Sequence, residues 1–348
     1  MEIGQKIKQL RYKAGLTQEQ LAERLGVSAQ SVSKWENAAS MPDISLLPLL
    51  SEAFGVSIDE LFDLTQEQKM RRIESRMDME EELAPDIFAD YEEFLRQQLL
   101  SAKEKQPVLS LLAHLYHHRM EADARRVSRY AREALGMEPG KKDCQWLLTM
   151  AEGAAAWDWN VSNHGKVIEL YKELIKNDHG KPTPGPYYYL LDNLIADHRT
   201  EEAKTYLKAF QALPGRKPPF MAEVYQAHIA LAEYDEPKAD AIMEEAARKY
   251  GTDSGFLFEA AQYHAKKCEY EEAIRLYEKS YASEEARKPR LIDALEGIAI
   301  IHEIMGDYGK AAQTYDRILE NLRQEWGFTD EVVVQEAEKE KNRLLQRK

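Results

Sequence analysis

Residues 27–43 read VSAQSVSKWENAASMPD, a run of small and polar side chains with one large aromatic, Trp35, near its centre. Val32 and Trp35 are three residues apart, so on a helix they lie on the same face. The opposite face is polar and consists of Gln30, Ser33, Lys34 and Asn37. We expect Trp35 to anchor this helix to a core and to leave the polar face free for a partner.

The residues before this stretch carry the signals of two more helices. Apolar residues recur at helical spacing from Ile3, and Thr17 with Gln20 has the form of a capping box that opens a second helix. Gly26 ends that helix, and Ser28 is a suitable N-cap for the next one. Two helices joined by a tight glycine turn, the second polar on its outer face, form a helix-turn-helix.

Two further helix starts follow the opening stretch. Asp43 can cap a helix through residues 46–53, and Ser57–Glu60 has the form of a second capping box. The sequence therefore predicts a compact domain of five helices over residues 1–64.

This domain resembles the DNA-binding domain of the lambda-repressor and Cro family, which is also called XRE-like. Three motifs carry the resemblance together: TQEQLAERLGVS (17–28), the SVSKWENAASMPD run that ends at residue 43, and a tail ending in FGVSIDELF (54–62). The match covers about a fifth of the chain, and it implies that the chain binds double-stranded DNA.

The resemblance also implies roles for individual residues. Recognition-helix positions that face base edges fall on Ser28, Ala29, Gln30, Ser33 and Lys34. Gln18 and Asn37 match positions that hold the flanking phosphates, and Arg11 with Glu36 matches a buried ion pair that joins the first helix to the recognition helix. The open alternative is that this polar face is only solvated or binds a protein.

Composition limits the classes of function. The net charge of −14 argues against nucleic-acid binding by the whole chain, but residues 1–64 carry only −3 of it, so the acidity lies mainly in the rest.

The chain has two cysteines, no apolar N-terminal leader and no apolar run long enough for a membrane span, so we expect a soluble cytoplasmic protein. Cofactor and catalytic motifs are missing, which predicts no enzyme and no cofactor. His114, His117 and His118 lack a completing ligand, so no metal site is predicted.

Residues 65–107 are expected to form a helical linker. Its first part, TQEQKMRRIESRMDMEEEL, is highly charged and favours helix. The basic residues there could add phosphate contacts, but a solvated linker is the favoured interpretation.

A repeated pattern fills residues 108–325. Tyr270, Ala273 and Tyr277 are spaced like Tyr308, Ala311 and Tyr315, and weaker copies are centred on Ala239, Ala203, Val167 and Val127. Successive centres are 34 to 40 residues apart. This pattern resembles tetratricopeptide repeats, in which antiparallel helix pairs stack into a solenoid. We expect an all-α protein with about six such TPR-like repeats, followed by a capping helix over residues 326–348.

The stacked pairs should enclose a concave face, which such proteins use to bind peptides or proteins. By the family pattern, the inward-facing candidates are Tyr188, Asp192, His228, Gln262 and Glu296. Each of them could equally be an ordinary solvated residue.

The order of the domains resembles that of peptide-responsive bacterial regulators. That resemblance implies a sequence-specific transcriptional regulator that forms a homodimer and holds a short peptide or a protein in the repeat groove. Two alternatives stay open. The repeat domain could act as a protein-interaction scaffold without a diffusible peptide, or it could direct an activity at a signalling protein.

Overall fold

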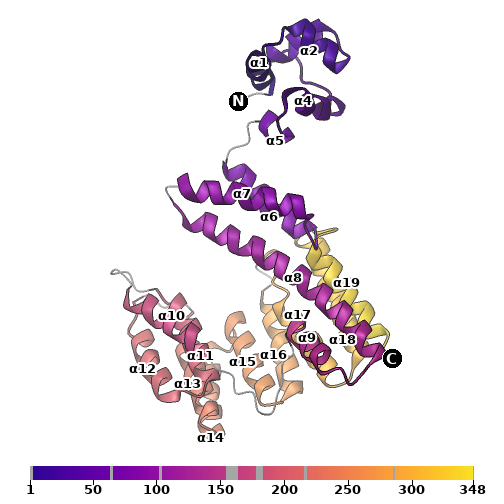
Figure 1. The fold of residues 1–348 in the computed structure, drawn as a ribbon. Helices are drawn as coiled ribbons and strands as arrows, with labels where there is room; N and C mark the ends of the chain where they lie inside the picture. Colours follow the sequence, from indigo (N-terminus) through magenta and orange to yellow (C-terminus); the bar gives the residue numbers. More distant parts are fainter. Residues whose placement is uncertain are drawn as a thin grey trace. The chain divides into compact units, whose positions relative to one another are not determined.

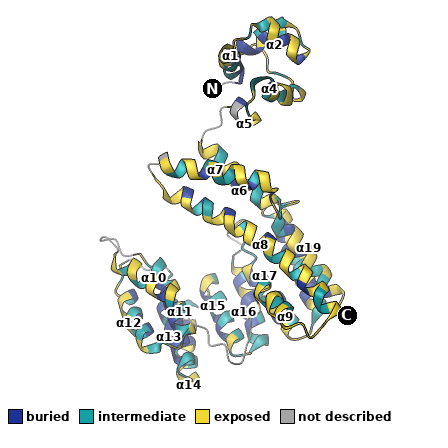
Figure 2. Ribbon diagram, in the orientation of Figure 1, coloured by how far each residue is buried: buried dark blue, intermediate teal, exposed yellow. Residues whose placement is uncertain are grey.

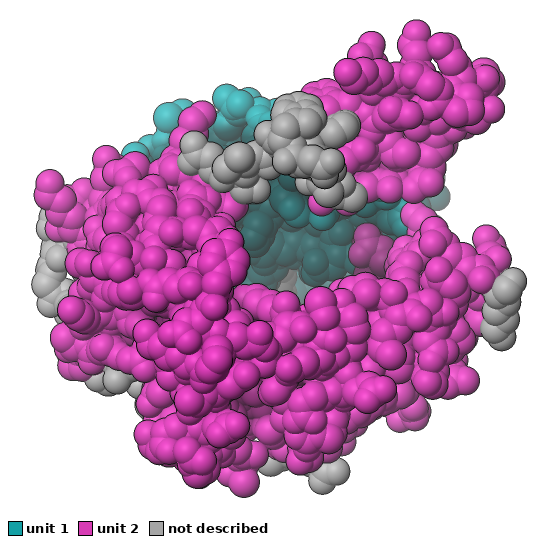
Figure 3. Space-filling view, turned by 90° about the horizontal axis from the view of Figure 1, so that it is seen from below, with its two compact units in different colours: residues 1–126 teal, residues 127–348 magenta. Residues whose placement is uncertain are grey.

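The computed structural model describes residues 3–62, 66–101, 104–153, 164–177, 183–214, 218–284 and 287–347. All regular elements in these ranges are helices, which confirms the all-α prediction (Figure 1). The chain divides into two compact units, residues 1–126 and 127–348 (Figure 3).

The first unit begins with the five helices expected from the sequence and continues with three more. Its elements are α1 Ile3–Lys13, α2 Gln18–Leu25, α3 Ala29–Glu36, the short 3₁₀ helix η1 Ile44–Leu46, α4 Leu47–Phe54, α5 Ile58–Leu61, α6 Gln66–Met79, α7 Pro85–Ser101 and the first part of α8 Gln106–Met137. Thr17 and Gln20 form the expected capping box, and Ser28 caps α3. Asp43 caps η1 rather than α4, because its carboxylate accepts the backbone N–H of Ser45.

The core of α1–α5 is small and apolar. Trp35 and Val32 are both buried in it, as predicted, together with Ile7, Leu21 and Leu50. The first helix approaches the recognition helix so closely that a Cβ on Gly4 would lie 1.8 Å from the carbonyl oxygen of Trp35. Only glycine allows this backbone contact, so Gly4 fixes how α1 packs on α3.

The segment expected as a linker has an apolar core of its own. Ile73 of α6, Phe88 and Leu95 of α7, and Leu111 of α8 are buried in one cluster. Two of the basic residues considered as phosphate ligands are already paired: Arg71 with Glu67, and Arg76 with Glu80. The bounds of the four expected domains stay a prediction.

The second unit is a stack of helix pairs. Its elements are the end of α8, α9 Lys142–Ala151, α10 Gly165–Lys176, α11 Gly185–Ala196, α12 Thr200–Gln211, α13 Met221–Ala232, α14 Glu236–Tyr250, α15 Ser254–Lys266, α16 Tyr270–Ser283, α17 Asp293–Ile304, α18 Tyr308–Gln324 and α19 Val332–Leu345. Four pairs are regular: α11–α12, α13–α14, α15–α16 and α17–α18, with buried residues gathered between their helices (Figure 2).

The residues predicted as repeat centres are buried between helices in these four pairs. The two predicted centres upstream, Val167 and Val127, are wrong. Ala203, Ala239, Ala273 and Ala311 are each 0% exposed, because the small side chain lets two helices cross closely. Val167 is instead 40% exposed, and its neighbour Ile168 takes the buried position. Val127 lies in α8, a single 32-residue helix rather than a pair. No glycine or proline interrupts residues 119–126, so nothing there breaks the helix.

Each of the four pairs turns through one residue in the left-handed conformation. The residues are His198, Tyr234, Cys268 and Gly306, with φ between 54° and 77°. Three of the four have a side chain that makes this conformation unfavourable, so the turn is imposed by packing of the two helices rather than by local preference.

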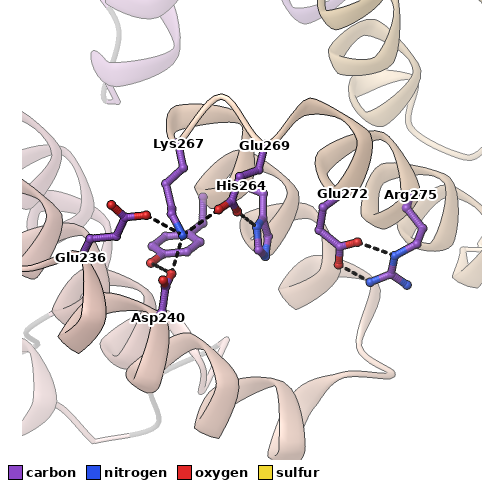
Figure 4. A network of polar contacts seen from close by, with 8 residues as sticks. Glu236, Asp240, His264, Lys267, Glu269, Glu272 and Arg275 are labelled. Atoms are coloured by element: carbon purple, nitrogen blue, oxygen red, sulfur yellow. Dashed lines mark hydrogen bonds and ion pairs between the residues drawn. The ribbon is translucent and has the colours of Figure 1, made fainter.

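A buried lysine joins neighbouring pairs (Figure 4). The side chain of Lys267 is 8% exposed and donates to Asp240 at 2.6 Å, Glu269 at 2.9 Å and Glu236 at 3.1 Å. Burial by itself would lower the pKa of Lys267, but these three carboxylates raise it above its ordinary value. The ammonium group therefore stays charged and ties α14 to the α15–α16 turn.

The last helix, α19, packs on α18. It buries Val334, Ala337 and Leu344 and leaves Val332 and Val333 only partly covered.

Candidate nucleic-acid interface and repeat groove

The outer face of α3 is the candidate DNA-reading surface. Ser28, Gln30, Lys34 and Asn37 are exposed, whereas Val32, Trp35 and Glu36 are buried on the opposite side. Ser33 is partly exposed. Ala29 is partly buried against the core, so it offers the surface only part of a methyl group.

A buried polar network holds this helix in place. The guanidinium of Arg11 donates to both carboxylate oxygens of Glu36, Nε to Oε1 at 2.6 Å and Nη2 to Oε2 at 2.8 Å. Arg11 also donates to the backbone oxygen of Leu16, and Gln18 donates to Glu36 Oε2 at 2.8 Å. The network thus links α1, the start of α2 and the end of α3.

The network also fixes the protonation state of its members. Burial by itself would raise the pKa of Glu36, but hydrogen bonds from Arg11 and then Gln18 lower it below its ordinary value. Glu36 is therefore ionised at neutral pH and balances the buried charge of Arg11.

The two residues matched to phosphate contacts already have partners within the protein. The Gln18 amide is engaged with Glu36, and the Asn37 side chain donates to the backbone oxygen of Ser33 at 2.9 Å. Both amides retain hydrogen-bonding groups beyond these contacts, since each side-chain amide has two donors and an acceptor.

The inward candidates of the repeat region lie on the first helices of the pairs. Direct contacts join α11 to α13 and α13 to α15, so these first helices approach one another as they do on the inner side of a curved stack. Tyr188 and Asp192 lie on α11, His228 on α13, Gln262 on α15 and Glu296 on α17.

Three of these candidates are titratable, and the protein around each of them disfavours its charged form, although Asp192 and Glu296 keep exposed surface. Burial raises the pKa of Asp192, and the neighbouring Tyr225 hydroxyl opposes that shift only in part. Burial also raises the pKa of Glu296. His228 is 8% exposed, and burial followed by the charge of Lys266 lowers its pKa to about 3, so its imidazole is neutral.

Sequence reasoning missed three neighbours of these groups: Tyr225, Glu259 and Lys266. The charge of Lys266 acts on both Asp192 and Glu259, and the charge of Asp192 acts on Glu259. Glu259 precedes Gln262 by three residues and Lys266 follows it by four, so helical periodicity would have placed them on the same face.

The described residues were also searched for a metal site and for a membrane-spanning helix. Among the described residues, no group of three His, Cys, Asp or Glu side chains is arranged to hold a metal ion. None of the helices in the described ranges has both the length and the apolar character to cross a membrane.

Comparison with known proteins finds relatives for the N-terminal part of the first unit. Residues 7–61 match the family model described as helix-turn-helix. The HTH-type transcriptional activator BcrR of Enterococcus faecalis is 49% identical over 61 residues, which are 18% of this chain and 30% of BcrR. The chain thus spans less than a third of the length of that relative.

A solved structure of PlcR from Bacillus thuringiensis, in complex with the peptide PapR7 and DNA, aligns with 92% of this chain and 96% of PlcR. Its sequence identity is 15% and its TM-score 0.24, so this likeness supports no conclusion about the chain.

A second sequence relative is matched almost over its whole length. The uncharacterised HTH-type transcriptional regulator YgzD of Bacillus subtilis is 34% identical over 62 residues, which are 18% of this chain and 94% of YgzD. With this match, the shared motif and the five-helix geometry, the chain belongs to the family of HTH-type transcriptional regulators.

Proposed function

We propose that the protein is a sequence-specific DNA-binding regulator that reads its operator with the outer face of α3. The observation that carries this proposal is the division of α3 into two faces. Trp35 and Glu36 hold the helix to the core, while Gln30 and Lys34 extend into solvent. Glutamine can pair bidentately with adenine, and lysine can reach the O6 and N7 atoms of guanine.

The flanking contacts follow from the same geometry. Gln18, the first residue of α2, and Asn37, the residue that caps α3, would hold the phosphates that flank the bases read by α3. A homodimer would place two such domains on half-sites about one turn of DNA apart. Under this proposal the protein acts in the cytoplasm and is not an enzyme.

We propose further that the inner face of the stacked pairs binds a short peptide or an extended protein segment. The support is a row of polar side chains on consecutive first helices, beside a cavity of about 380 Å³ lined by residues of α13, α15, α16 and α17. The alternative is a scaffold that binds a folded protein and does not respond to peptide.

Selection from a pool of random DNA duplexes tests the first proposal. Wild-type full-length protein should enrich an inverted repeat, and Gln30→Ala/Lys34→Ala should lose it, because each base-reading pair contributes about 1–3 kcal/mol of discrimination. Gln313→Ala/Lys238→Ala makes the same chemical change on exposed positions of the second unit and should select as the wild type does. Equal enrichment by the α3 variant would refute the reading role of α3.

A further inference from the structure

The inner face of the second unit carries unbalanced negative charge. Asp192 of α11 and Glu259 of α15 interact with the cation of Lys266, seven residues after Glu259 on the same side of α15. Arg287 also lines the cavity that Glu259 lines. Within the described residues, no ion pair within 4.0 Å joins Lys266 to either carboxylate. Neither carboxylate therefore has a cationic partner at ion-pair distance, although the Tyr225 hydroxyl interacts with Asp192. Glu296 on α17 is a further acidic residue on a first helix.

Solvent reaches these groups, yet protein surrounds them. Asp192 is exposed and Glu259 is partly exposed, but burial raises the pKa of both carboxyls, and for Glu259 the charge of Asp192 adds to the effect. The protein packed around them leaves less water to stabilise their charge than an open surface would. A cation brought between them would gain more than it would on an open surface.

His228 points to a ligand independently of these charges. Its side chain is more than nine-tenths buried and neutral, and none of the described residues forms a hydrogen bond with its ring nitrogens. These nitrogens keep some contact with solvent and are not used by the protein, so they are open to a hydrogen bond with a ligand. A neutral imidazole has one donor and one acceptor, which suits a peptide backbone.

An apolar cavity adjoins the same carboxylate. Glu259 also lines the cavity of about 380 Å³, whose apolar wall is formed by Phe220, Phe258, Tyr281 and Leu291. That volume falls in the range of ordinary ligand sites and accommodates an aromatic or branched side chain.

We infer that the groove selects a peptide with a cationic group, which lies between Asp192 and Glu259, next to an apolar side chain that fills the cavity beside Phe258. The inference rests on the proposed peptide-binding function and names the chemistry of its ligand. The cation is either a basic side chain or a free amino terminus, because both present an ammonium-type donor to carboxylates.

The test uses full-length protein and four pools of C-amidated hexapeptides. Three pools are N-acetylated with one position fixed as Arg, Gln or Glu and the others random. The fourth has a free amino terminus and fixed Gln. Wild-type protein should retain the Arg pool, the free-amine pool or both about tenfold more than the acetylated Gln pool. The peptides it retains should be enriched in aromatic or aliphatic residues next to the cation.

The charge-neutral variant Asp192→Asn/Glu259→Gln should lose that preference while still retaining peptides. The matched control, Glu244→Gln/Glu271→Gln, removes two exposed carboxylates from the second helices of the pairs and should behave as the wild type does. Circular dichroism verifies that each protein is folded.

Three results would overturn the inference. Equal retention of all pools by the wild type, or an unchanged preference in the charge-neutral variant, removes the cation site and leaves peptide binding standing. Failure of the folded wild type to retain any pool removes the proposed peptide function together with the inference.

Discussion

Replacing Glu36 by Gln should destabilise the DNA-binding domain strongly, although the two side chains have nearly the same shape. The substitution removes the charge that balances Arg11, which is only 5% exposed. It also turns one carboxylate oxygen into an amide NH₂ group. Both oxygens accept hydrogen bonds in the wild type, so at least one N–H donor would then face another donor.

The magnitude follows from the burial of the pair. Breaking a buried ion pair on one side costs about 3–5 kcal/mol, because the remaining charge is left without a partner. A domain of ordinary stability has roughly 5–15 kcal/mol in total, so Glu36→Gln should leave this one marginal. Arg11→Met/Glu36→Gln removes the stranded charge and should be less destabilised than the sum of its single variants.

Trp35 provides the assay, since it is the only tryptophan in residues 1–126 of a chain that has five. Replacing the four other tryptophans by Phe makes its fluorescence report on unfolding of the first unit in the full-length protein. Urea titrations of the wild type, both single variants and the double variant then give the coupling free energy between Arg11 and Glu36.

Two outcomes would refute this account. A cost below about 1 kcal/mol for Glu36→Gln would mean that the pair is solvated, as exposed ion pairs are. Simple additivity of Arg11→Met and Glu36→Gln would mean that the two groups do not stabilise one another across the α1–α3 contact.

Three other predictions concern packing and charge elsewhere. Gly4→Ala should destabilise the first unit by about 1–3 kcal/mol or more, because the added Cβ overlaps the carbonyl of Trp35, and the same fluorescence titration measures it. His228 has a pKa of about 3 in the folded state against about 6.5 when unfolded, so the unfolded chain binds more protons between these values and stability falls as pH drops below 6.5. His228→Gln should flatten that decline by up to about 1.4 kcal/mol per pH unit in denaturation followed by circular dichroism; an unchanged slope would contradict a buried neutral imidazole. Lys267→Met should cost roughly 1–3 kcal/mol in the same assay, less than a fully buried pair because its carboxylate partners are partly exposed, and no loss would mean that this network is dispensable.

Local patterns in the sequence were enough for the helix-turn-helix of α1–α3. The capping box at Thr17, the cap at Ser28 and the three-residue spacing of Val32 and Trp35 specify where helices begin and which side of α3 is buried. Those signals act over one or two turns of helix, so they can be interpreted without knowing the rest of the chain.

The repeat region was predictable where small residues are required and not elsewhere. Ala203 and its three equivalents are buried because two helices cross there, and the sequence shows that requirement directly. The prediction that Val167 is buried was wrong because its neighbour Ile168 fits the same apolar pattern. Only the packing of the helices decides which of the two is buried. The continuous α8 was missed because a repeat was assumed where no breaker ends the helix.

The sequence by itself determined the all-helical class, the helix-turn-helix and the spacing of the stacked pairs, since each depends on contacts between residues close along the chain. Only the tertiary structure decided that Asp192 on α11 interacts electrostatically with Glu259 and Lys266 on α15, and that His228 on α13 is buried and neutral. These residues come from three helix pairs, and their pKa shifts arise from burial that the curved stack creates. Burial and charge at such a distance along the chain depend on how the helices pack, which no local pattern records.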